Sequence, residues 1–109
     1  MANAFKNRTL RQVGTSPTDV GAVVASSTET TLIGMTLANV TSGVINVTVQ
    51  LINGGNTTHI VKDAPIPTGG SLVAVGGDQK IVLITGDKVT ITSNTASSCD
   101  VIMSFLEIT

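Results

Sequence analysis

Residues 45–56 read INVTVQLINGGN, and this stretch decides the fold class. Every second residue from Ile45 to Leu51 is apolar, and the residues between them are polar. Because successive side chains of a strand point to opposite faces, this alternation predicts a strand with one face on a core. Asn53-Gly54-Gly55-Asn56 follows, and its residues tolerate the positive φ of a tight turn. The stretch therefore predicts a strand and the turn that leads into the next one.

The same period of two recurs elsewhere along the chain. It predicts further strands at Ile33–Leu37, Thr57–Val61 and Val89–Thr92. Two more segments, Ile81–Ile84 and Val101–Leu106, are apolar on both sides. That pattern is typical of central strands or of strands at a subunit contact.

Turn residues separate these segments. Gly76-Gly77-Asp78 and Gly86-Asp87 predict turns, and Pro65 and Pro67 predict an interruption of the chain between Asp63 and Ser71. The sum is about eight short strands at roughly ten-residue spacing. The sequence therefore predicts an all-β protein with an antiparallel β-sandwich of jelly-roll type.

The first part of the chain has a different character. Lys6, Arg8 and Arg11 lie there without an acidic partner. We predict an extended N-terminal arm over residues 1–18, with one short strand at Thr9–Val13, and a sandwich domain over residues 19–109. The three cations of the arm are predicted to bind a neighbouring subunit.

The overall composition points to association with other proteins. The net charge is −1, and 12% of the residues are charged against about a quarter in an ordinary soluble domain. No apolar run approaches the roughly 18 residues of a membrane span, and no secretory signal is evident. We therefore expect neither a specific nucleic acid nor a membrane as partner, and we expect other subunits to cover the uncharged surface.

No residue pattern predicts catalysis. His59 is the only histidine and is predicted to be a strand residue at a rim or an interface. Cys99 is the only cysteine, which excludes an internal disulfide and a cysteine-based zinc site, and we predict an inert thiol at the start of a strand. Trp and Tyr are absent, which disfavours a sugar-binding platform. We predict no enzyme, no catalytic residue, no cofactor and no metal ligand.

Three segments carry a resemblance to a known group of proteins. His59–Ser93, which includes PIPTGGSL and GGDQKIVL, together with Thr30–Val40 (TTLIGMTLANV) and Asp100–Ile108 (DVIMSFLEI), resembles small virion structural proteins of tailed bacteriophages, including those of cyanobacteria. The likeness covers residues 20–109. It implies a structural protein of the virion that is assembled in the host cytoplasm.

The function expected from these observations is that of a capsid decoration protein, which binds and stabilises the shell through subunit contacts. The expected partners are copies of the chain itself, with a trimer by analogy to other jelly rolls, and the major capsid protein or tail proteins. The alternatives are a neck, tail or baseplate component and a module that binds carbohydrate on the host surface.

Overall fold

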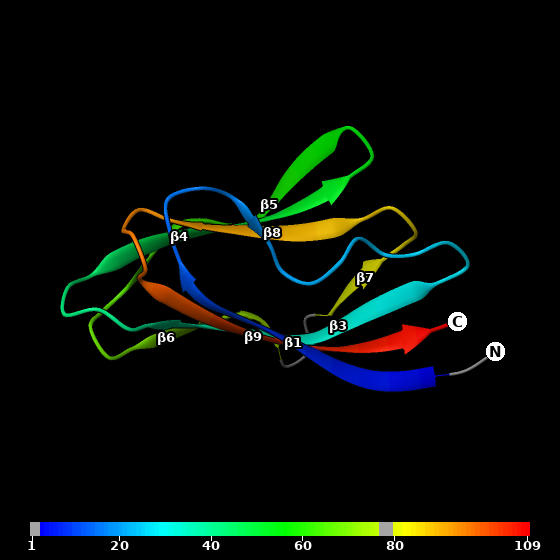
Figure 1. The fold of residues 1–109 in the computed structure, drawn as a ribbon, viewed down its shortest axis with the longest axis horizontal. Coiled ribbons are helices and arrows are strands. Elements are labelled where there is room, and N and C mark those ends of the chain that lie inside the picture. Colours follow the sequence, from blue (N-terminus) through cyan, green and yellow to red (C-terminus); the bar gives the residue numbers. More distant parts are fainter. Residues whose placement is uncertain (1–2, 77–79) are drawn as a thin grey trace.

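Two antiparallel sheets pack face to face in the computed structural model, which describes residues 3–76 and 80–109 (Figure 1). The strands are β1 (Asn3–Val13), β2 (Thr18–Asp19), β3 (Glu29–Asn39), β4 (Ile45–Asn53), β5 (Asn56–Ile66), β6 (Ser71–Val75), β7 (Ile81–Leu83), β8 (Lys88–Ser93) and β9 (Cys99–Ile108). One sheet has the order β1-β9-β3-β6, with β7 also paired to β3, and the other has the order β2-β8-β4-β5. No helix among the described residues is long and apolar enough to cross a membrane.

The strand pairs are nested along the chain. β1 pairs with β9, β2 with β8, β3 with β6 and β7, and β4 with β5, all antiparallel. The chain therefore behaves as one long hairpin that rolls up into a sandwich, and this is the topology of a jelly roll. The prediction of an all-β, antiparallel, jelly-roll sandwich is confirmed.

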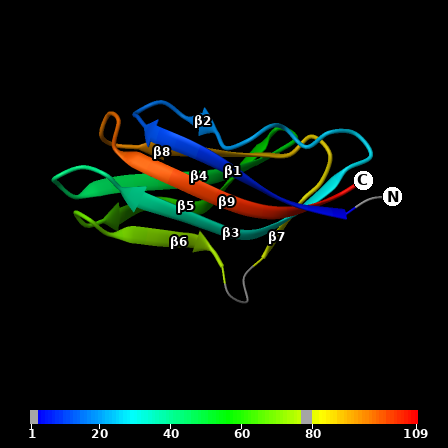
Figure 2. The ribbon, with the colours of Figure 1, turned by 60° about the horizontal axis from the view of Figure 1, so that its bottom comes forward.

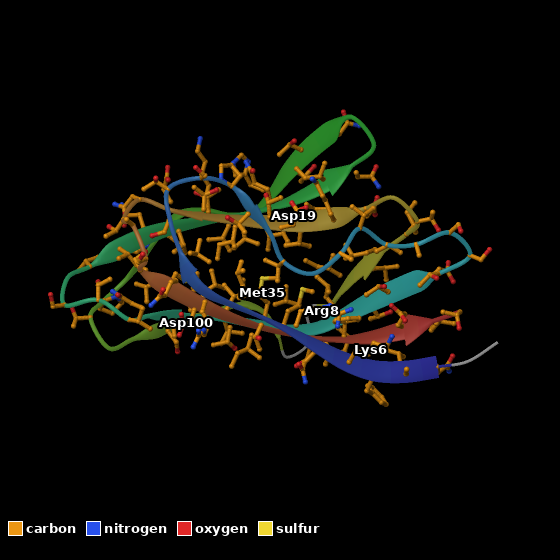
Figure 3. All side chains as sticks on the ribbon, viewed as in Figure 1. Lys6, Arg8, Asp19, Met35 and Asp100 are labelled. Atoms are coloured by element: carbon orange, nitrogen blue, oxygen red, sulfur yellow. The ribbon has the colours of Figure 1, made fainter. Side chains whose placement is uncertain are left out.

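Alternation in the central strands builds the core. In β9 the side chains of Val101, Met103 and Phe105 point inward, at 5% exposure or less. Met35 of β3 lies opposite Met103 in the register and is visible between the two sheets in Figure 3. The second sheet contributes the buried residues Ile45, Val47, Val49, Ile66, Val89 and Ile91. Burial of such side chains stabilises a fold by about 1.5–3 kcal/mol each.

The predicted strands are all present, and most of them are longer than predicted. The apolar segment Val101–Leu106 lies in β9, between β1 and β3, as expected for a central strand. Pro65 does not interrupt the chain as predicted, because it lies inside β5. β5 is an outer strand of its sheet, where the missing N–H of proline costs no ladder hydrogen bond. Two of the residues in the predicted turn at Gly76-Gly77-Asp78 lie outside the described residues.

The N-terminal segment requires a correction. The sequence predicted an arm over residues 1–18 with a strand only at Thr9–Val13, but residues 3–13 form the strand β1. β1 pairs with β9 from Asn3 to Val13, with one irregularity after Leu10, and it is the outer strand of its sheet (Figure 2). The backbone is extended as expected, yet the segment is part of the sandwich. The three cations suggested an arm. An alternation of apolar and polar residues is weak in this segment, because a strand at the edge of a sheet buries few of its side chains.

The buried side-chain nitrogen and oxygen atoms of the described residues have hydrogen-bond partners, with one exception. The carboxylate of Asp87 accepts a hydrogen bond from Asn53 Nδ2 at 2.7 Å and one from the Ile84 N–H at 3.1 Å. The Ser98 hydroxyl, which is fully buried, donates to the Thr95 carbonyl at 2.7 Å. Thr90 Oγ1 is buried without a hydrogen-bond partner. A buried hydroxyl without a partner loses its hydration and gains nothing in return.

We therefore expect Thr90→Val to raise the free energy of unfolding by about 0.5–1 kcal/mol, because it removes the unpaired hydroxyl and keeps the side-chain shape. Urea unfolding followed by circular dichroism measures this change. The matched control is Ser98→Ala, which breaks a satisfied bond and should lower the free energy of unfolding by about 1 kcal/mol. Equal destabilisation by both substitutions would contradict this account of Thr90.

Candidate interaction surface

The outward side of the β1-β9-β3-β6 sheet is an uncharged surface. Its strands are in register, so that Thr9, Ile102, Thr36 and Val73 form one row across the four strands. A second row runs through Phe5, Leu106, Thr31 and Val82, and Asn7 and Ser104 lie between the two rows. We call these ten residues the neutral face.

Several large apolar side chains of the neutral face are open to solvent. The exposed fractions are 79% for Phe5, 62% for Val73, 61% for Val82 and 57% for Ile102. Scattered exposed apolar residues are ordinary on proteins, but their gathering on one uncharged face, here interspersed with the small polar residues Thr31 and Thr36, favours an interaction site. Half of the eight exposed large apolar residues of the described chain lie on this one sheet face.

Charged side chains of this sheet stand at its ends or on its inward side. Glu29 lies at one end of β3, and Asp100 lies at the start of β9, where its Oδ1 accepts a hydrogen bond from the Gln12 N–H at 2.9 Å. No charged residue lies in either row of the neutral face. A partner surface can therefore cover the face without the cost of removing an ion from water.

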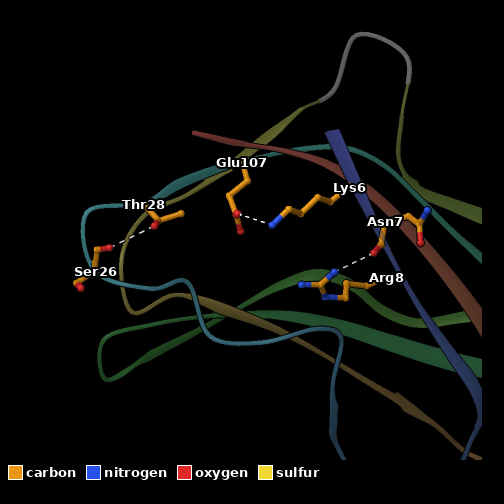
Figure 4. A network of polar contacts seen from close by, with 6 residues as sticks. All are labelled: Lys6, Asn7, Arg8, Ser26, Thr28 and Glu107. Atoms are coloured by element: carbon orange, nitrogen blue, oxygen red, sulfur yellow. Dashed lines mark hydrogen bonds and ion pairs between the residues drawn. The ribbon is translucent and has the colours of Figure 1, made fainter. Parts of the chain in front are cut away.

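Two of the three predicted partner-binding cations, Lys6 and Arg8, have contacts inside the chain. In the β1–β9 register Lys6 lies opposite Phe105 and Arg8 opposite Met103, so both point to the inward side. Lys6 Nζ contacts Glu107 Oε1 at 2.8 Å (Figure 4), and the Arg8 guanidinium lies 5.3 Å from the centre of the Phe105 ring. A partly exposed ion pair of this kind contributes at most about 1 kcal/mol. Arg11 is exposed, and the binding of a partner by Lys6, Arg8 and Arg11 stays a prediction.

Arg8 also lines a cleft between the sheets. The cleft has about 150 Å³, and the segment 20–25 and the inward side chains of β9 form its walls. Gly21, at φ +80°, lies under Arg8, and a Cβ on Gly21 would be 3.0 Å from Arg8 Cγ. Sites for small molecules usually have about 300–1,000 Å³. The cleft is too small for such a ligand, and its glycine lets the arginine side chain pack closely.

A larger hollow lies at the opposite flank, between the two sheets. It has about 370 Å³ and is lined by Leu51, Thr58, His59, Ile60, Ala74 and Ile81. We call it the flank hollow. The β4–β5 register slips at Ile60 and again at residues 62–63, and Asp63 has φ 50°. Such bulges bend a strand, and the tip of the β4–β5 hairpin turns away from the sandwich in Figure 1.

His59 has no arrangement that suggests catalysis. It lies in the strand β5, as predicted, and lines the flank hollow, and its Nε2 lies 3.1 Å from Nε2 of Gln50, the neighbouring residue on β4. The described part of the chain holds no group of three or more His, Cys, Asp or Glu residues that could bind a metal ion.

Sequence reasoning found part of this surface. The two-sided apolar character of Val101–Leu106 indicated either a central strand or a subunit contact, and β9 has the exposed residue Ile102 on its outward side. Phe5 and Val73 were missed, because their place on one face follows from the pairing of strands distant in sequence. The flank hollow gave no sequence signal, since its lining residues come from four different strands that come together only in the folded chain.

Comparisons with known proteins concern the fold. No family model matches the sequence, and no curated protein matches it. A chain of the Bacillus endospore appendages, described as a novel family of disulfide-linked pili, is similar with a TM-score of 0.62 and 16% identity, over 98% of this chain and 88% of that chain. This likeness shows that the two chains share the jelly-roll fold over nearly their full lengths.

Two viral structures match less well. A chain of the infectious bursal disease virus Gx strain gives a TM-score of 0.44 at 12% identity, over 97% of this chain and 31% of that chain. A pentameric capsid protein isolated from metagenomic phage sequences gives a TM-score of 0.38 at 13% identity, over 94% of this chain and 59% of that chain.

Cys99 is buried as the first residue of β9, at 0% exposure. Burial raises the pKa of the Cys99 thiol to about 11, and the neighbouring charge of Asp100 acts in the same direction. The reactive form of cysteine is the thiolate, so both the burial and the raised pKa make this thiol unreactive.

We expect no reaction of the native protein with a disulfide reagent such as Ellman's at pH 8, and one thiol per chain after denaturation. The control is Thr58→Cys, which adds a thiol at an exposed position and should react within seconds to minutes. A native thiol that reacts as fast as the added one would show that Cys99 is accessible.

Proposed function

We propose that this protein is a non-enzymatic structural component of a phage virion, and specifically a capsid decoration protein that binds the shell through the neutral face. One observation carries the proposal, namely the sheet face with four exposed large apolar side chains and no charged residue in its rows. Such a face suits a subunit that is permanently covered. The jelly-roll fold, which is common in capsid proteins, and the resemblance of residues 20–109 to tailed-phage virion proteins support the same role.

The size of the face fits a moderate interface. Four strands at about 4.8 Å spacing and about eight residues at 3.3 Å per residue give roughly 500 Å² on one side. Two covered surfaces together therefore amount to about 1,000 Å², at the lower limit for a specific contact. Attachment of many copies to a repeating shell would add to the strength of each contact.

The alternatives differ in what they require. A carbohydrate-binding module needs an aromatic platform, and the sequence has two Phe and neither Trp nor Tyr. A neck, tail or baseplate component uses the same kind of neutral face and differs in copy number.

The Bacillus appendages of similar fold are disulfide-linked. Because Cys99 is fully buried, this chain is proposed to associate without a disulfide.

We expect Ile102→Glu to weaken binding to virions by more than about a hundredfold, because an unpaired charge in a covered contact costs about 3–5 kcal/mol. Virions stripped of the protein are incubated with each variant and sedimented, and the bound fraction is measured. Val44→Glu is the control, since Val44 is similarly exposed, at 62%, in the loop between β3 and β4. Val73→Glu, in the same row as Ile102, should repeat the loss.

Mass spectrometry of purified virions tests whether the protein decorates the shell or belongs to the neck or tail. Hundreds of copies per particle support shell decoration, and about a dozen support a neck or tail ring instead. Absence of the chain from virions, or equal binding of Ile102→Glu and Val44→Glu, would overturn the proposed function.

A further inference from the structure

Phe5 is an aromatic side chain left in solvent on the outermost strand of a sheet. It is the most exposed of the large apolar residues in the described chain, at 79%. The other phenylalanine, Phe105, is buried in the core. Among the described strands β1 pairs only with β9, so no strand of the same chain stands beside Phe5 on its free side. An aromatic ring gains much from burial, and aromatic side chains are enriched among the anchors of protein contacts.

The flank hollow has the properties of a receptor for such a ring. Its lining residues Leu51, Ile60, Ala74 and Ile81 are partly buried and pack against the core. None of the six lining residues is acidic or a lysine or arginine. A dry apolar cavity of about 150 Å³ accepts a benzene ring, so the 370 Å³ of the hollow offer enough room for a phenyl group.

The ring and the hollow lie on opposite sides of the molecule. β1, which carries Phe5, and β6, which carries Ala74, are the two outer strands of one sheet (Figure 2). Phe5 therefore cannot enter the hollow of its own chain. A contact between the two requires a second copy, and it joins different patches of the two partners. Such a head-to-tail contact leaves one free ring and one free hollow on every pair, so that further copies add to form a ring or a filament.

We propose that Phe5 of one copy inserts into the flank hollow of a second copy. The occupant is another copy of this chain because the chain itself presents an exposed uncharged ring and, at the opposite edge of the sheet, a hollow of sufficient size whose six lining residues include no acidic residue, lysine or arginine. This self-association goes beyond the proposed function, since a monomer could decorate a shell through the neutral face alone.

The first experiment measures the self-association of the full chain by sedimentation velocity over a range of concentrations. We expect the wild type to form species larger than the monomer and Phe5→Ala to associate at least about tenfold more weakly, as for the loss of an aromatic anchor. Val44→Ala is the matched control and should behave as the wild type. Thermal unfolding should be nearly unchanged for both variants, because both side chains are exposed.

The second experiment is a complementation test. Ala74→Phe fills the hollow and leaves the ring intact, whereas Phe5→Ala removes the ring and leaves the hollow intact. Each variant alone should be monomeric, and an equimolar mixture should form heterodimers but nothing larger. A mixture that stays monomeric while both variants are folded would overturn the proposal.

If Ala74→Phe does not fold, a cross-linking experiment tests the same contact. Chains with Asn7→Cys, which keeps Phe5 and adds a thiol on the same side of β1, are mixed with chains carrying Thr58→Cys, which lines the hollow, and treated with a short bis-maleimide. We expect cross-linked Asn7→Cys/Thr58→Cys dimers to exceed the homodimers of each variant at least about tenfold, because the proposed contact brings only this pair of positions close together. Equal yields of all pairs would contradict the proposed contact.

Two outcomes of the first experiment reject the proposal outright. They are a wild type that remains monomeric up to about 1 mM, where even weak contacts appear, and a Phe5→Ala variant that associates as the wild type does. Loss of virion binding in Ile102→Glu with normal self-association, or the reverse, would separate the failure of this contact from the failure of the proposed function.

Discussion

The strand β9 is the constraint on which the rest of the structure depends. Every second residue from Val101 to Phe105 enters the core, so the residues between them, such as Ile102, must face outward. An apolar residue at such a position adds nothing to the core. Because β9 lies between β1 and β3, its outward side is the middle of the neutral face. The strand period therefore couples core packing and the exposed apolar surface in a single element.

The placement of charge follows from the same register. Lys6 and Arg8 point inward with Phe105 and Met103, where Glu107 and an aromatic ring contact them. Had β1 been shifted by one residue, both cations would stand on the outward face and Phe5 would point between the sheets. The register that the β1–β9 ladder selects thus keeps the outward side free of charge. The cost is an aromatic ring in solvent, which the proposed contact with a second copy would remove.

The fold was largely predictable from the sequence, whereas the interaction surfaces were predictable only in part. Alternation in 45–51 and turn residues such as Gly54 are local signals, and they predicted the jelly-roll sandwich without knowledge of pairing. β1 was mistaken for an arm, because an outer strand shows little burial and three cations dominated its pattern. Val73 and Ile102 are 29 residues apart in sequence, and only the ladders through β3 bring them into one row. The flank hollow combines side chains of β4, β5, β6 and β7, and only the folded chain brings these four strands around one cavity.

The two proposed contacts use different directions of the molecule. A partner reaches the neutral face in the direction perpendicular to the sheet, whereas the contact between Phe5 and the flank hollow joins the β1 edge of one copy to the β6 edge of the next. Phe5 is the only residue that takes part in both the neutral face and the proposed contact with the flank hollow. A ring or filament joined from β1 to the opposite flank therefore leaves the row through Ile102 uncovered in every copy. Copies joined in this way would present their neutral faces together, and a repeating shell could then bind them as one multivalent unit.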